Sequence, residues 1–262
     1  MDSRPLGFFD SGVGGISIWK AVHRLLPHEN TLYLADNKNA PYGDKTKEEI
    51  IHLSEKNTEF LLEYNAKLIV VACNTASTNA IPHLRQKYRV PFIRIQPALK
   101  PAMLQSRAKK VGLLATAGTL ESEMLEELKQ IIPAKDVEII SRYGKGLVEI
   151  VEKGKMNSRE SRSLLKKYLE PMKRQGVDKL VLGCTHYPFL QEEMQEILGN
   201  QVEIIEPSEA IARQTKRVLE DKNALAPEIY PAKHYFWANQ ETKILYDILK
   251  EYPSARIDLK RF

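Results

Sequence analysis

Short apolar runs alternate with segments of helical periodicity throughout the 262 residues, and this alternation constrains the fold more than any other feature. The apolar runs are typical of strands buried on both faces of a sheet, and the amphipathic segments are typical of covering helices. Such chains form parallel sheets with helices on both sides. The expected strands are Leu6–Phe9, Thr31–Ala35, Lys67–Ala72, Phe92–Ile95, Val111–Ala115, Val137–Ile140, Leu180–Gly183 and Val202–Ile205.

Two of the helical segments carry end signals. The segment from Thr46 to Tyr64 begins with Thr46 and Glu49, which have the spacing of a capping box. Another segment stops at Gly176, a residue that commonly ends helices. Its apolar face is made of Leu164, Leu165, Tyr168, Leu169 and Met172.

Two stretches of the first half recur in the second half. Residues 6–14 resemble residues 111–119, because each joins an apolar strand with glycine at its second position to a turn containing a hydroxyl residue. The run that ends at Cys73 resembles the run that ends at Cys184. The separations are 111 − 6 = 105 and 184 − 73 = 111 residues. Two pairs in the same order indicate two similar α/β halves.

Cys73 and Cys184 each follow a buried strand and precede polar side chains and an expected helix start. Ligands of parallel α/β sheets bind beyond the carboxyl ends of strands, and helix N-termini lower thiol pKa values and hold carboxylates. A structural role would explain one buried cysteine, but two in matched settings favour a functional pair.

Two opposed thiols suit the inversion of a carbon centre, which needs a base on one face and an acid on the other. Asp10, at the end of the first strand, is a candidate to accept a proton from Cys73 or to hold a substrate ammonium group. His186, two residues after Cys184, is a candidate for the same role on the other side.

The turn Gly12-Val13-Gly14-Gly15 offers a competing interpretation. It follows the first strand, and Asp36 ends the next strand 36 − 12 = 24 residues later, as in a dinucleotide site. The third glycine of that fingerprint would fall at position 17, where the chain has Ser17. Glycine-rich turns bind small anions equally well, so the dinucleotide site is the weaker interpretation.

Composition excludes several classes of protein. The 39 basic and 34 acidic residues are dispersed, so the net charge of +5 does not indicate nucleic-acid binding. The longest apolar run, Leu68 to Cys73, is far shorter than the ~20 residues of a membrane span, and no signal segment opens the chain. We therefore expect a cytoplasmic protein with reduced thiols and no membrane contact. Without Cys-x-x-Cys spacing, we expect no metal site.

Together these residues resemble the aspartate/glutamate racemase superfamily, and within it the glutamate racemases, over nearly the whole chain. The matching blocks are Phe9 to Gly15, Pro41 to Gly43 with Glu48 and Glu49, Ala72 to Ser77, and Leu182 to Pro188. Weaker matches are Pro97 to Pro101, Thr116 with Thr119, and Glu209 to Ala212.

The resemblance implies two similar doubly wound α/β domains, residues 1–97 plus 208–262 and residues 98–207, with the active site in the cleft between them. It implies a two-base mechanism without cofactor or metal, in which Cys184 serves L-glutamate and Cys73 serves D-glutamate, with Asp10 and His186 assisting. The D-glutamate would supply peptidoglycan for the cell wall. The implied substrate-binding residues are Asp10, Ser11, Pro41, Tyr42, Gly43, Asn74, Thr75, Thr116, Thr119, Thr185 and His186. The oligomeric state stays open, a homodimer included.

Ser77 favours the glutamate branch, because aspartate racemases usually carry histidine there. The chain departs from the family pattern at Ala35, Asn39, Gln96, Tyr143-Gly144 and Glu206-Pro207. The departure at Tyr143-Gly144 leaves the role of Glu152 open.

Three alternative functions remain. An aspartate racemase would share the same catalytic residues. A hydrolase would use Cys184 with His186, although residues so close in sequence rarely form a triad. A non-catalytic protein that binds an amino acid or a dinucleotide would need neither thiol.

Overall fold

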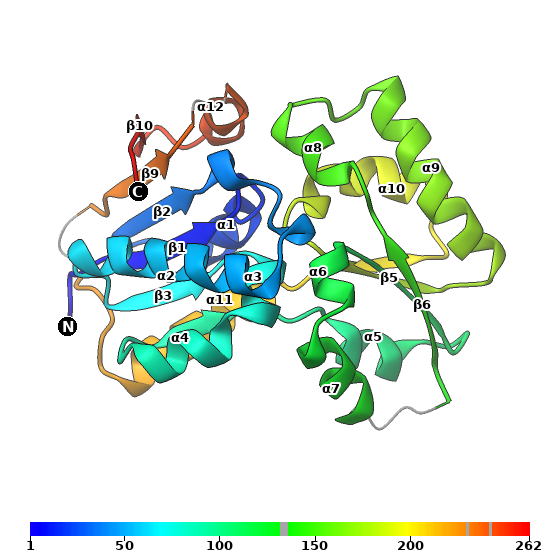
Figure 1. The fold of residues 1–262 in the computed structure, drawn as a ribbon, viewed down its shortest axis with the longest axis horizontal. Coiled ribbons are helices and arrows are strands. Elements are labelled where there is room, and N and C mark those ends of the chain that lie inside the picture. Colours follow the sequence, from blue (N-terminus) through cyan, green and yellow to red (C-terminus); the bar gives the residue numbers. More distant parts are fainter. Residues whose placement is uncertain (132–135, 229–230, 241–242) are drawn as a thin grey trace.

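The computed structural model describes residues 1–131, 136–228, 231–240 and 243–262. Two separate sheets organise these residues, and every strand pairing in them is parallel. Each sheet forms a lobe with its own helices (Figure 1). The predicted fold class, two doubly wound α/β units with mainly parallel sheets, is therefore confirmed.

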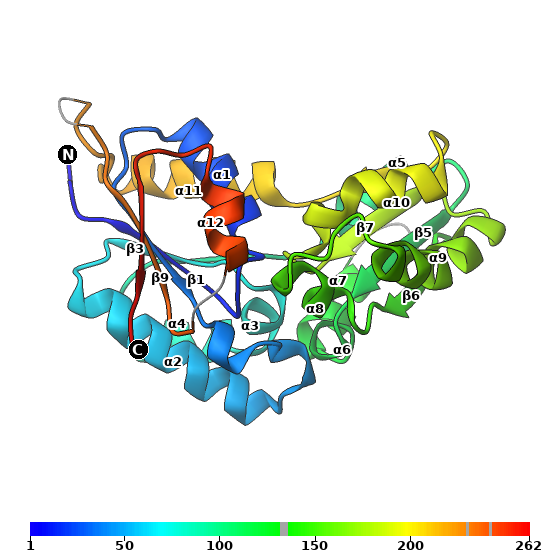
Figure 2. The same cartoon turned by 90° about the horizontal axis from the view of Figure 1, so that it is seen from above.

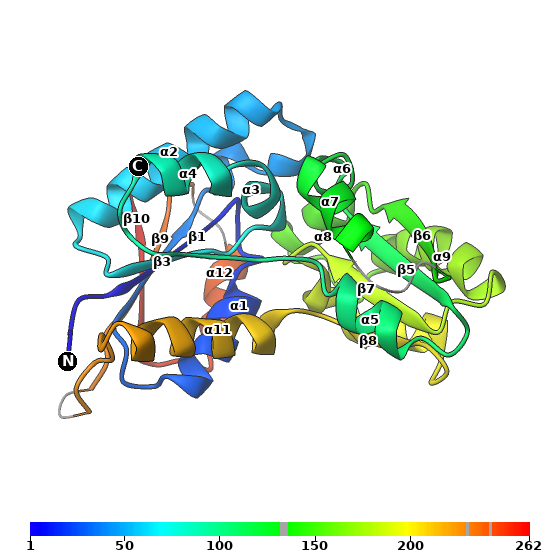
Figure 3. The same ribbon diagram turned by 90° about the horizontal axis from the view of Figure 1, so that it is seen from below.

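The first lobe contains the six-stranded sheet, in the order β10-β9-β2-β1-β3-β4. Its strands are β1 (Leu6–Asp10), β2 (Thr31–Ala35), β3 (Leu68–Val71), β4 (Phe92–Arg94), β9 (His234–Ala238) and β10 (Ala255–Leu259). On one face lie α1 (Ile16–Leu25), α11 (Ser208–Asp221) and α12 (Lys243–Leu249); on the other lie α2 (Lys47–Glu63), α3 (Asn74–Asn79) and α4 (Ile81–Lys87) (Figures 2 and 3). Two short 3-10 helices, η1 (Asn37–Asn39) and η2 (Tyr42–Asp44), follow β2.

The second lobe contains the four-stranded sheet, in the order β6-β5-β7-β8. Its strands are β5 (Lys110–Ala115), β6 (Glu138–Tyr143), β7 (Lys179–Gly183) and β8 (Glu203–Ile205). Apolar residues of α5 (Leu99–Gln105) and α7 (Glu123–Ile131) pack on one face, and those of α8 (Leu147–Glu152), α9 (Arg159–Arg174) and α10 (Gln191–Leu198) pack on the other. The remaining helices are α6 (Ala117–Leu120) and the 3-10 helix η3 (Tyr187–Leu190).

The predicted repeat is visible in the sheets, because β2-β1-β3-β4 and β6-β5-β7-β8 follow the same order. In the register, Leu6 pairs with Leu68 and Val111 pairs with Lys179. Residue 68 of β3 thus corresponds to residue 179 of β7, an offset of 179 − 68 = 111. The same offset superimposes the two cysteines, since 73 + 111 = 184.

All eight expected strands are present, with ends that differ by three residues or fewer. The expected helix from Thr46 is α2, and both halves of its capping box form: the Glu49 N–H donates to Thr46 Oγ1 and the Thr46 N–H donates to Glu49 Oε2. The helix expected to stop at Gly176 is α9, and this glycine adopts a φ of +82°, which other residues rarely adopt. Strands β9 and β10 were not predicted.

Contacts at the crossings between the lobes agree with the expected chain division. Helix α5 packs against β5 and β7, whereas α11 packs against α1. These contacts support boundaries near residues 97 and 207, and the division itself stays a prediction. No helix within the described ranges has the length and apolar character that a membrane span requires.

Candidate active site

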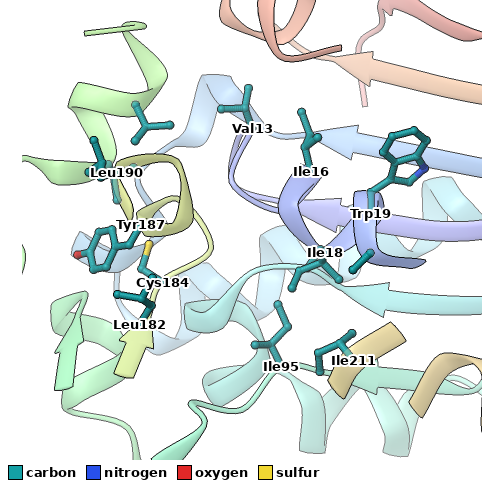
Figure 4. Close-up of a cluster of buried hydrophobic side chains, with 14 of the residues drawn as sticks. Val13, Ile16, Ile18, Trp19, Ile95, Leu182, Cys184, Tyr187, Leu190 and Ile211 are labelled. Atoms are coloured by element: carbon teal, nitrogen blue, oxygen red, sulfur yellow. The ribbon is translucent and has the colours of Figure 1, made fainter. Parts of the chain in front are cut away.

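The two lobes meet through apolar side chains and enclose a small polar cavity. Figure 4 shows part of the apolar cluster that spans both lobes, with Ile16 and Trp19 in the first lobe and Cys184 beside Leu182 and Tyr187 in the second. The cavity has a volume of about 10 Å³. Its lining residues are Ser11, Pro41, Tyr42, Gly43, Cys73, Asn74, Thr75, Thr116, Val148, Cys184, Thr185 and His186. The structure therefore brings together every predicted site residue except Asp10 and Thr119, which lie behind it.

Both cysteines are buried free thiols, with exposed fractions of 4% and 6%. Cys73 is the N-cap residue of α3, as expected. After Cys184 the chain continues with the polar residues Thr185 and His186 and then begins the 3-10 helix η3, of which His186 is the N-cap residue. Cys73 thus lies directly at the start of an α-helix, whereas Cys184 lies two residues before the N-cap residue of a short 3-10 helix.

Cys73 lies among neutral and acidic partners. Its thiol contacts Ser11 Oγ at 3.8 Å, and the Ser11 N–H donates to Asp10 Oδ1 at 2.8 Å. The Gly15 N–H donates to Asp10 Oδ2 at 2.7 Å, so the completely buried carboxylate is held by the glycine turn. Burial raises the pKa of Asp10, although His186 opposes this shift. Burial and the charge of Asp10 raise the pKa of Cys73 well above its usual value, which favours the protonated thiol.

Cys184 lies beside a charged pair. Its Sγ is 3.8 Å from His186 Nδ1, and His186 Nε2 is 2.6 Å from Glu152 Oε1. Burial opposes a charged imidazole, but the contacts with Cys184, Glu152 and Asp10 outweigh it and raise the pKa of His186 well above its usual value. Burial alone would raise the pKa of Glu152, yet the bond with His186 lowers it. Both shifts favour the charged form of the pair that His186 and Glu152 make next to Cys184.

Glu152, whose role the sequence leaves open, lies at the site. It ends α8, one turn after Val148, which lines the cavity. In the sequence, Glu152 is only an acidic residue four positions after Val148, on the same face of a short apolar helix. Such a pattern is too common to identify a functional residue.

The glycine turn allows the second lobe to approach. A Cβ atom added to Gly12 would lie 1.9 Å from Glu152 Oε1, and one added to Gly14 would lie 2.3 Å from His186 Nδ1. The two side chains thus occupy the space beside these glycines. Asp36, the acidic residue on which the dinucleotide interpretation depends, accepts a hydrogen bond from Tyr42 OH at 2.5 Å. Neither the glycine turn nor Asp36 therefore supports the dinucleotide interpretation.

Polar side chains from both lobes complete the cavity wall. Thr75 Oγ1 is 2.9 Å from Thr116 Oγ1, which donates to Thr119 Oγ1 at 3.0 Å. Thr119 is completely buried behind this pair. Within the described part of the chain, neither amide atom of the Asn74 side chain has a hydrogen-bond partner, although both are buried. This amide is therefore ready to bind a polar ligand in the cavity. The described residues contain no group of three His, Cys, Asp or Glu side chains placed to hold a metal ion.

Comparisons with known proteins point to one family. The family model described as Asp/Glu/hydantoin racemase matches residues 16–215. Curated glutamate racemases from Herpetosiphon aurantiacus and Methylococcus capsulatus are 42% and 43% identical to the chain, over 87% and 93% of its length and 89% of theirs. The crystal structure of a glutamate racemase isoform from Bacillus anthracis has a TM-score of 0.85 at 28% identity, covering 100% of this chain and 99% of that one. The Escherichia coli glutamate racemase in complex with L-glutamate and the activator UDP-MurNAc-ala has a TM-score of 0.85 at 34% identity, covering 98% of each chain.

Proposed function

The chain belongs to the Asp/Glu/hydantoin racemase family, and on that premise we propose that it interconverts L- and D-glutamate by a two-base mechanism. The observation that carries this proposal is the pair of thiols at equivalent strand ends of two similar lobes, both lining one cavity. Neither a hydrolase that uses Cys184 with His186 nor a non-catalytic binding protein would need the second thiol.

In the proposed reaction the thiolate of one cysteine removes the α-proton, and the thiol of the other delivers a proton to the opposite face. The bond from the α-carbon to hydrogen breaks on one side and forms on the other, so the substrate is inverted and the two sulfurs exchange protonation states. His186 supplies a positive charge beside Cys184. Ser11 links the other thiol to Asp10, because its hydroxyl contacts Cys73 and its N–H donates to Asp10. No electron-sink cofactor is required by this chemistry.

Binding of an amino acid requires a more open arrangement than this one. A cavity of about 10 Å³ holds roughly one water molecule, far less than glutamate. The lobes must therefore separate to admit the substrate. When they close, Ser11, Asn74, Thr75 and Thr185 are the groups that we propose hold its carboxylates and ammonium. We also propose that the D-glutamate formed supplies peptidoglycan synthesis in the cytoplasm.

Circular dichroism of the dialysed, metal-chelated protein with each enantiomer of glutamate and of aspartate tests the proposal. We expect both enantiomers of glutamate to racemise without added cofactor, and aspartate to react far more slowly. In D₂O the deuterium should appear mainly in the inverted product, because the incoming hydron comes from the opposite thiol. A requirement for pyridoxal phosphate or a metal, or a preference for aspartate, would contradict the proposal.

A further inference from the structure

The carboxylate of Glu152 is held by both lobes at once. Its Oε1 accepts a hydrogen bond from the Val13 N–H at 2.7 Å and contacts His186 Nε2 at 2.6 Å. Its Oε2 accepts a hydrogen bond from Asn37 Nδ2 at 2.7 Å. Val13 and Asn37 belong to the first lobe, whereas Glu152 and His186 belong to the second. Separation of the lobes must therefore break the bonds from Val13 and Asn37 and leave the bond between Glu152 and His186 within its own lobe.

Asn37 lies outside the cavity that contains the thiols. It lines an adjacent outer cavity of about 230 Å³, together with Glu149, Glu152, Lys153 and Gln240. Pro41 and Val148 line both cavities. Asn37 can therefore influence the thiols through Glu152, and it does not touch the reacting atoms.

We propose that Asn37 is a positioning residue of the racemase: on closure it binds Glu152 Oε2 from the opposite lobe and holds the carboxylate against His186, the partner of Cys184. The inference deepens the proposed function and rests on it. It assigns a role to the loop after β2, because η1 carries the donor across to the second lobe. The hydrogen bond from Asn37 therefore forms when the lobes close, and in the same step it orients Glu152 and His186 beside Cys184.

The chemistry of the contact sets the direction of the expected effects. Burial by itself raises the pKa of Glu152, and the donors His186, Val13 and Asn37 together lower it. Loss of the Asn37 donor should raise that pKa, so that Glu152 becomes protonated at higher pH. The other titratable groups that face Glu152 are Asp10, Tyr33, Glu149 and Lys153, and none of them changes in the test below.

Two substitutions separate this role from a merely structural one. Asn37→Ala removes the donor. Asn37→Asp places a second carboxylate within hydrogen-bond distance of Glu152, so one of the two must take up a proton. Lys38→Gln is the matched control, because Lys38 is the exposed neighbour in the same turn and its substitution changes the net charge by the same amount as Asn37→Asp.

The first readout does not depend on the substrate. Carbon NMR of the protein labelled at glutamate carboxyl groups, with Glu152→Gln to assign the signal, should show a higher pKa for Glu152 in Asn37→Ala, and in Asn37→Asp it should show Glu152 titrating together with the new carboxyl group. The Lys38→Gln protein should match the wild type. An unchanged pKa of Glu152 overturns the inference, whatever the enzyme acts on.

The second readout uses glutamate. We expect kcat/KM to fall about tenfold, as when other orienting groups are lost, and its decline at acidic pH to begin at higher pH. The deuterium isotope effect of α-deuterated substrate should increase for the enantiomer that Cys184 deprotonates and decrease for the other, because the proton transfer at Cys184 becomes more limiting. Equal loss of rate with neither change would mean a structural role and overturn the inference. A wild-type protein that does not racemise glutamate would refute the proposed function, while the NMR titration still decides the role of Asn37.

Discussion

Cys73 and Cys184 occupy equivalent positions in two lobes with the same strand order, yet their neighbours differ in kind. Cys73 contacts the hydroxyl of Ser11 and lies near the buried Asp10, and these surroundings raise its pKa. Cys184 contacts His186, whose own pKa is raised and which is paired with Glu152. The repeat thus places one thiol from each lobe in the wall of one cavity, and the side chains around the two thiols differ in charge.

The contacts between the lobes differ in the same way. On the Cys73 side the lobes meet through neutral hydroxyl groups, with Thr75 bonded to Thr116. On the Cys184 side they meet through the Glu152 carboxylate. In the proposed reaction one sulfur carries a proton while the other does not, and the two exchange these states in each turnover. Substitutions near each thiol test whether the two sets of surroundings act differently.

The largest effects should come from the thiols themselves. Cys73→Ala or Cys184→Ala removes the base in one direction and the acid in the other, so both directions should lose at least ~10²–10⁴-fold in kcat/KM. Equilibrium fixes the ratio of forward and reverse kcat/KM, so neither variant becomes a one-way enzyme. Proton exchange without inversion should nevertheless differ: in D₂O, Cys73→Ala should exchange L-glutamate and Cys184→Ala should favour D-glutamate. Inversion near the wild-type rate in either variant would indicate a single base.

Gly12→Ala should disturb the contact between the lobes beside Cys184 and leave both thiols in the protein. The added methyl group would overlap Glu152 Oε1, so the lobes cannot close fully and kcat/KM should fall about 10²-fold. Gly176→Ala is the control for a general effect of alanine, since no atom lies within 4 Å of its added carbon. Its positive φ should cost about 1–2 kcal/mol of folding stability and leave kcat/KM unchanged. Full activity of Gly12→Ala would show that the close approach is not needed.

Glu152→Gln should remove the charged partner of His186 and so reduce the difference in charge between the surroundings of the two thiols. Loss of the carboxylate charge lowers the pKa of His186, so the imidazolium is lost at lower pH and the activity at alkaline pH should decline earlier. We expect kcat/KM to fall about tenfold to a hundredfold at neutral pH. Glu149→Gln, on the same helix, should leave the pH profile unchanged.

The same substitution has a stability signature. The raised pKa of His186 means that its stabilisation is fully present below the unfolded value of about 6.5 and is lost as pH rises through the folded value. Thermal unfolding should therefore show the difference between wild type and Glu152→Gln shrinking as the pH becomes alkaline. A difference that stays constant with pH would contradict the charged pair.

The smallest effect should come from the hydroxyl contacts on the Cys73 side. Thr119→Val removes the acceptor of the Thr116 hydroxyl and should cost about 1 kcal/mol of folding stability, with kcat/KM changed less than about threefold. Thr58→Val is the matched control. Thr58 is equally buried, and its hydroxyl has no hydrogen-bond partner within the described residues, so this substitution should be neutral or stabilising in thermal unfolding. An equal loss in both variants would mean that the hydroxyl bond contributes nothing.

Local periodicity in the sequence determined much of this protein by itself. Apolar runs bounded by helical segments identified eight strands, and the pair Thr46 and Glu49 marked the start of α2, because these signals depend on residues close in sequence. The same logic placed both cysteines beyond the carboxyl ends of strands. Strands β9 and β10 escaped it: β10 is a largely exposed edge strand with charged residues, and β9 lies beside β2, some 200 residues away in sequence.

The contacts that reach across from the other lobe follow from the three-dimensional structure and not from the sequence pattern. The sequence pattern of Gly12 to Gly15 is compatible with a nucleotide, and the structure fills that space with Glu152 and His186 from the other lobe. Asn37 carried no recognisable signal, because its function depends on a carboxylate 115 residues away. Hydrogen bonds and charge effects act over a few ångströms in space and do not depend on separation along the chain. Sequence periodicity can therefore locate a reactive residue, but it does not identify partners that come from distant parts of the chain.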